Sequence, residues 1–143
     1  MATVAYHDLP SPLCALPEPD EPVTLVDLRD TALPLLRITH CTLSALAATV
    51  ASDPAILHDL APTLAGLADE VDLCRDLIDR APYDELREKA APVLRSAYVS
   101  LQGFSLLVAR DQVFLEDLAA ALGALAAQVE VCRDLVDRAT CDR

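Results

Sequence analysis

The chain has no tryptophan and no asparagine, and it contains only three glycines and a single lysine, Lys89. Aromatic residues make up 3% of its 143 positions, whereas 53% of the positions are hydrophobic. A core of this composition must be built from Leu, Val and Ala side chains, which suits packing between helices. We therefore expect a single all-α domain.

Positive charge is also scarce. The chain has 11 Lys and Arg residues against 23 Asp and Glu residues, which gives a formal net charge of −12. This balance argues against nucleic-acid binding, because affinity for nucleic acids comes largely from Lys and Arg side chains that neutralise phosphates. It equally disfavours binding to an anionic membrane surface. A basic protein partner, a high-salt cytoplasm and simple solubility remain open as explanations of the acidity.

Targeting and membrane-spanning signals are missing from the sequence. The N-terminus shows no basic region followed by an apolar run, so we expect no signal peptide. The longest uncharged run, from Ile38 to Ser52, has 15 residues. A transmembrane helix needs roughly 18 to 20, so we expect no membrane association.

The five cysteines do not form a recognisable framework. They are Cys14, Cys41, Cys74, Cys132 and Cys141, and no two of them have CxxC spacing. An odd number at this spacing argues against a disulfide scaffold and against a zinc knuckle. The cysteines therefore predict reduced thiols in a cytoplasmic protein, with no metal or other cofactor.

What the chain does contain is a repeat with an offset of 58 residues. The segment VDLCRDLIDRA at 71–81 returns as VEVCRDLVDRA at 129–139. Residues 27–81, the first copy, and residues 85–139, the second copy, are identical at about 25 of the 55 aligned positions. This internal similarity predicts two copies of one helical hairpin in tandem.

The apolar positions within each copy are spaced for helices. The second half of each copy has apolar residues at alternating intervals of three and four, which places them on one side of a helix. These residues are Leu57, Leu60, Leu64, Leu67, Val71, Cys74 and Ile78, and Leu115, Leu118, Leu122, Leu125, Val129, Cys132 and Val136. Two amphipathic hairpins can cover each other's apolar stripes. The sequence thus predicts an up-down-up-down four-helix bundle built from a tandem duplicated hairpin.

Proline and cap residues mark the boundaries. Residues 1–23 hold five of the ten prolines, which predicts a Pro-rich extended or disordered arm before a bundle of residues 24–143. Asp53 before Pro54 indicates a helix start, and Asp111 is expected to cap the last helix. Pro34 and its counterpart Pro92 are expected to bend their helices alike. The four helices are predicted over 24–51, 54–80, 84–109 and 112–139.

The repeated CRDLxDR motif places opposite charges four residues apart. The expected pairs are Arg75 with Asp79, Asp76 with Arg80, Arg133 with Asp137, and Asp134 with Arg138. Such pairs each stabilise a helix by only about 0.2–0.5 kcal/mol. The motif is interpreted as a self-paired solvated face, or alternatively as a charged surface at one end of the bundle that docks a partner.

The first and third predicted helices carry little charge. A helix on the outside of a monomeric bundle should show a charged face, so these helices are predicted to be covered by a second protomer. The interface candidates are His40, Ser44, Ala47, Tyr98, Gln102 and Ser105.

No catalytic set emerges, because no P-loop, nucleophile elbow, HExxH or ExxH metal motif is present. The leading hypothesis is therefore a non-enzymatic protein-interaction module, such as an adaptor, a regulator or an immunity-type bundle, that forms a homodimer. The alternative is a bundle that binds a small ligand or a metal between the first and third helices. Its candidate residues are Thr39, His40, Cys41 and Tyr98.

Overall fold

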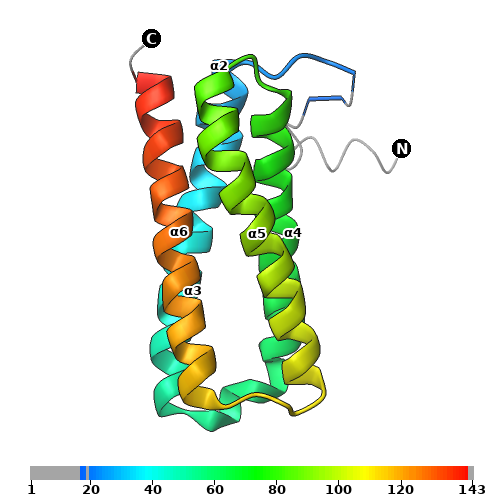
Figure 1. Cartoon of the computed structure of the whole chain (residues 1–143), viewed down its shortest axis with the longest axis vertical. Coiled ribbons are helices and arrows are strands. Elements are labelled where there is room, and N and C mark those ends of the chain that lie inside the picture. Colours follow the sequence, from blue (N-terminus) through cyan, green and yellow to red (C-terminus); the bar gives the residue numbers. More distant parts are fainter. Residues whose placement is uncertain (1–16, 19, 142–143) are drawn as a thin grey trace, which may run out of the picture.

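The computed structural model describes residues 17, 18 and 20–141. These residues form helices and connecting turns, without a strand (Figure 1). Four long helices run alternately down and up the length of the molecule. They are α3 (Leu33–Ser52), α4 (Leu57–Arg80), α5 (Asp84–Ala109) and α6 (Leu115–Cys141). The prediction of an all-helical bundle is confirmed.

The most extensive contacts join helices from different halves of the chain. Helix α3 packs along α6, and α4 packs along α5, while α3–α4 and α5–α6 touch less. Helices α3 and α5 are therefore diagonal neighbours, as are α4 and α6 (Figure 1). Each sequence-adjacent hairpin is splayed, and each of its helices finds its closest partner in the other half.

The predicted apolar seams form the core. Leu64 of α4 and Leu122 of α6 have no exposed surface, and neither do the thiol-bearing residues Cys74 and Cys132. Burial of such a seam is the main source of stability for a helix whose isolated form would be marginal. The 3.6-residue period of the sequence thus places these side chains inside the bundle.

Two short helical elements precede α3, the first long helix. Helix α2 (Leu25–Asp27) opens with a capping box, in which the Thr24 side chain accepts from Asp27 N and the Asp27 side chain accepts from Thr24 N. A π-helical turn, η2 (Leu28–Ala32), follows before α3 begins. This wider turn precedes Pro34, whose ring would collide with an earlier carbonyl in a regular α-helix. Pro92, in contrast, lies inside α5 without such a turn, so the two prolines are accommodated differently.

The links at the lower end of the bundle differ from the prediction in one place. A short 3-10 helix, η3 (Pro54–Ile56), leads into α4, and the Asp53 side chain accepts from Ala55 N at 3.1 Å. Asp111, however, does not cap α6, which begins only at Leu115. It closes α5 instead, with a left-handed φ of 54°. The amide of Asp111 bonds Val108 O and that of Gln112 bonds Leu107 O, which is a Schellman motif.

Candidate functional surfaces

The four candidate ligand-site residues lie apart from one another. The buried Thr39 hydroxyl donates to Glu70 Oε2 of α4 at 3.2 Å. His40 Nδ1 lies 2.9 Å from the carbonyl of Ala126 in α6, which fixes Nδ1 as the protonated nitrogen. Cys41 is exposed. These three consecutive residues therefore face α4, α6 and solvent in turn.

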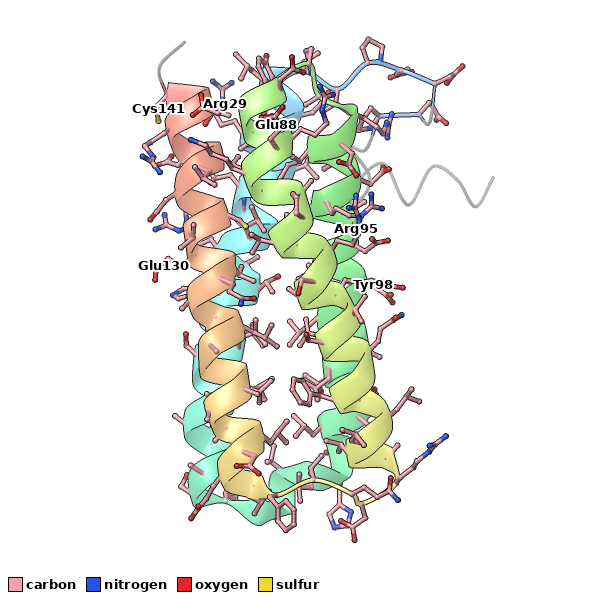
Figure 2. The ribbon with its side chains drawn as sticks, viewed as in Figure 1. Arg29, Glu88, Arg95, Tyr98, Glu130 and Cys141 are labelled. Carbon is pink, nitrogen blue, oxygen red and sulfur yellow. The ribbon has the colours of Figure 1, made fainter. Side chains whose placement is uncertain are left out.

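Tyr98, the fourth candidate, belongs to a different part of the surface. Its hydroxyl accepts a hydrogen bond from Gln102 Nε2 at 2.6 Å on the same helix. Figure 2 shows Tyr98 on the outer side of α5 and Glu130 on the opposite side of the bundle. His40 Nε2 lies 3.9 Å from Glu130 Oε2. The structure thus places His40 and Tyr98 at separate edges.

The six interface candidates divide in the same way. His40, Ser44 and Ala47 line the α3–α6 pair, whereas Tyr98, Gln102 and Ser105 line the α4–α5 pair. At each edge one side chain crosses to a neighbouring backbone, because Ser105 Oγ donates to Ala61 O of α4 at 2.7 Å, as His40 does to α6. The candidates therefore form two faces of the bundle and not one.

The two faces differ in the size of their exposed side chains. On α3 the exposed positions next to the candidates hold Cys41 and Ala48. The corresponding positions of α5 hold Val99, which is 62% exposed, and Leu106, which is 59% exposed. The six interface candidates from the sequence are neighbours of these two residues and include neither Val99 nor Leu106. The pairing of α5 with α4 leaves them outside the core.

The charged motif is paired as predicted in the first copy. Arg75 Nη1 lies 2.6 Å from Asp79 Oδ2, and its Nε lies 2.8 Å from Asp72 Oδ1. Arg80 Nη1 bonds Asp76 Oδ2 at 3.2 Å. The two carboxylates that bond Arg75 raise the pKa of its guanidinium, against the opposing effect of its partial burial.

The second copy uses its motif differently. Arg133 pairs with Asp134 at 2.8 Å and with Glu130 at 3.8 Å, in place of the predicted Asp137. Arg138 Nε donates to the main-chain carbonyl of Asp134 at 3.4 Å, in place of its carboxylate. The prediction of i,i+4 ion pairs is therefore right for the first copy and wrong for the second.

The upper end of the bundle carries a groove of about 500 Å³ between the start of α5 and the end of α6. Its walls come from residues 82–86 and Lys89 on one side and from Leu135, Arg138 and Ala139 on the other. Lys89 in this wall bonds Glu85 Oε1 at 2.8 Å. The groove is not apparent from the sequence, because its two walls are about 50 residues apart in the chain.

The two buried thiols make matching contacts. Cys74 Sγ donates to Ala32 O and Cys132 Sγ donates to Ala90 O, each at 3.7 Å. Burial raises the pKa of the Cys74 thiol, and the nearby charges of Glu70 and Cys132 raise it further. Burial also raises the pKa of Cys132 to about 12. Both thiols are thus protonated and unreactive at neutral pH.

Within the described part of the chain, no three His, Cys, Asp or Glu side chains are grouped closely enough to hold a metal ion. The helical stretch Leu25–Ser52 is long and apolar enough to cross a membrane by length and composition. It contributes buried residues to the bundle, and a core helix satisfies the same criteria. This stretch therefore carries no argument for a membrane-spanning role.

Comparison of the chain with protein-family models, with curated proteins and with solved structures finds no match. The function must accordingly be argued from the surfaces themselves.

Proposed function

We propose that the chain is a non-enzymatic interaction module that forms a homodimer through the α4–α5 face. The observation that supports this proposal is the apolar stripe of Val99 and Leu106, which lie seven residues apart and are mostly exposed. Gln102 lies between them. A seven-residue spacing places both side chains on one line along the helix.

The surroundings of this stripe suit a helical interface. Ser105 of α5 donates to Ala61 O of α4, and Pro62 and Ala65, one and four residues after Ala61, are exposed. Tyr98 and Ser105 are half-buried. Exposed large apolar side chains that adjoin one another mark interaction surfaces more often than single ones do. A twofold dimer would place each stripe against its own copy, because a twofold interface uses the same patch of both chains.

The matching α3–α6 face offers a weaker seam. Its exposed positions at the 58-residue offset are Cys41, Ser44 and Ala48, and Ile38, three residues before Cys41, is 53% exposed. Cys41 and Ala48 bring less apolar surface out of water than Val99 and Leu106 do, and the hydrophobic gain scales with that area. The same fold therefore presents two related faces, of which the α4–α5 face is the proposed dimer seam.

The test is the solution mass measured by light scattering. We expect about twice 15.3 kDa for the natural chain and the single mass for Leu106→Glu, because a carboxylate would be buried against its own copy. Ala48→Glu is the matched control at the same position of the first copy, and it should remain a dimer. Circular dichroism checks that both variants stay helical.

Each result has a defined meaning. A natural chain that is monomeric overturns the dimer proposal. A dimer that survives Leu106→Glu and dissociates with Ala48→Glu would move the seam to the α3–α6 face and overturn the proposal of an α4–α5 seam.

A further inference from the structure

The N-terminal segment before α2 is held against the bundle by one arginine of the repeated motif. This segment, residues 17–23, is called the strap, and Pro19 within it lies outside the described residues. Arg80 Nη2 donates to the main-chain carbonyls of Glu18 at 2.5 Å and Glu21 at 2.9 Å. Figure 1 shows the strap passing over the end of the bundle where α4 ends.

The backbone of the strap contains a turn. Glu21 N donates to Glu18 O at 2.9 Å, so a turn brings both carbonyls toward the same guanidinium. Val23 is 1% exposed and serves as an apolar anchor. The contacts with Arg80 use main-chain atoms, and the side chains of Glu18 and Glu21 remain exposed.

The groove at the other side of this end is the corresponding place in the second copy. Arg138 is the counterpart of Arg80, and it lines the groove between α5 and α6. Its guanidinium is exposed and bonds the carbonyl of Asp134 in its own helix. Leu77, near Arg80, has no exposed surface, whereas its counterpart Leu135 is only partly buried in the groove wall.

A segment that covers one site and is missing from the other would give this difference between Leu77 and Leu135. The first copy supplies that segment from its own N-terminal side. The second copy is preceded by α4 and the short link to α5, so its preceding residues belong to a helix already packed in the bundle. Among the described residues there are thus two related sites, at Arg80 and at Arg138, and one strap, which is bound at Arg80.

We propose that the groove beside Arg138 binds an extended, proline-containing segment of a partner protein, of the same kind as the strap. Arg138 donates to two of the segment's main-chain carbonyls, and an aliphatic side chain packs against Leu86 and Leu135. The groove walls carry two cations, Lys89 and Arg138, and two carboxylates. Recognition therefore depends on carbonyl geometry and the apolar anchor more than on net charge.

This groove is formed by the first residues of α5, while the proposed dimer seam includes Leu106 near the last turn of that helix. The two proposals concern opposite ends of α5. Either one can fail without the other.

The test uses a synthetic peptide of residues 17–24 with blocked termini, titrated into the full-length isotope-labelled chain and followed by NMR. Concentrations up to about millimolar are needed, because a tethered segment has an effective concentration of that order. We expect saturable shifts at Leu135 and Arg138. Arg138→Ala should weaken binding at least tenfold, since a donor that serves two carbonyls is lost.

Two controls separate this site from general effects. Arg110→Ala removes an exposed arginine at the far end of α5 and should leave the affinity unchanged. A peptide in which Val23 is replaced by Asp should bind at least tenfold more weakly, because its apolar anchor is gone. Helicity by circular dichroism confirms that the protein variants are folded.

Three outcomes overturn the proposal. They are an absence of binding at millimolar peptide, binding that is unaffected by Arg138→Ala, and shifts confined to the Arg80 end. The last result would mean that the peptide displaces the strap at Arg80 and that the groove beside Arg138 is not a second binding site.

Discussion

The two copies of the repeat have matching interiors and different ends. Each buried thiol donates to a carbonyl 42 residues earlier in the chain, and the buried seam leucines of α4 match their counterparts in α6 in burial. Yet Arg80 binds the strap while Arg138 lines an open groove. Seam residues therefore determine how the helices pack, whereas polar residues outside the seam determine what each end of the bundle can bind.

The largest expected effect tests the shared interior. Leu64→Ala and Leu122→Ala should each lower the free energy of unfolding by about 2–5 kcal/mol, because each removes a fully buried side chain and leaves a cavity. The two losses should agree within about 1 kcal/mol. Denaturant unfolding at equal protein concentration measures both.

A severe loss at one of these leucines with little change at the other would break the equivalence of the two interiors. Ala127→Ser, at an exposed site of α6, serves as the control and should change stability by less than about 0.5 kcal/mol.

The second effect concerns the buried thiols at high pH. Because the pKa values of Cys74 and Cys132 are raised in the folded state, the folded chain keeps protons that the unfolded chain loses above about pH 9. Stability is therefore fully present below pH 9 and falls as the pH rises toward 12. Each thiol should change the unfolding equilibrium constant by roughly tenfold per pH unit in this window.

Between pH 8 and 11, the free energy of unfolding should fall with a smaller slope against pH in Cys74→Ala and in Cys132→Ala than in the natural chain. The slope should fall further in the double variant. Cys41→Ala, an exposed thiol on α3, should keep the natural slope. Equal slopes in the natural chain and in all four variants would show that the thiols are not the groups that titrate.

The third effect tests a polar contact that the first copy has and the second lacks. Thr39→Val removes the hydroxyl that donates to Glu70 and keeps the side-chain volume. We expect a loss of about 1 kcal/mol. The second copy has Ala97 and Gln128 at these positions, so it offers no such bond.

A double-mutant cycle with Glu70→Gln isolates the contact from other effects of each substitution. Additive losses in the double variant would mean that Thr39 and Glu70 do not interact in solution.

The smallest effect separates two aspartates at equivalent positions. Asp111→Gly should raise stability by about 0.5–1 kcal/mol, because glycine adopts the left-handed conformation without steric strain. Asp53→Gly should instead lower it by a few tenths of a kcal/mol, since the bond to Ala55 N is lost. Thermal unfolding of the two variants, each compared with the natural chain, shows whether each substitution raises or lowers stability. Equal signs would contradict the different roles described for the two residues.

Much of the fold follows from spacing in the sequence. Alternating intervals of three and four residues determine the helices and the buried side of each, and the residues Asp84 and Ala109 bound α5 as predicted. A proline or an aspartate indicates that a helix ends or begins nearby, but it does not indicate which of two adjoining helices it belongs to. Asp111 therefore looked like a cap for α6, although it terminates α5, because either role places an aspartate in the same link.

The sequence alone determined the helical class, the internal similarity and the core residues, because these depend on periodicity within one segment. The tertiary structure decided which helices pair most closely, which exposed apolar residues stay uncovered, and where the groove beside Arg138 lies. Each of these depends on the relative placement of segments that are distant in the chain. Local residue patterns carry little information about that placement, since several arrangements of four amphipathic helices can bury the same seams.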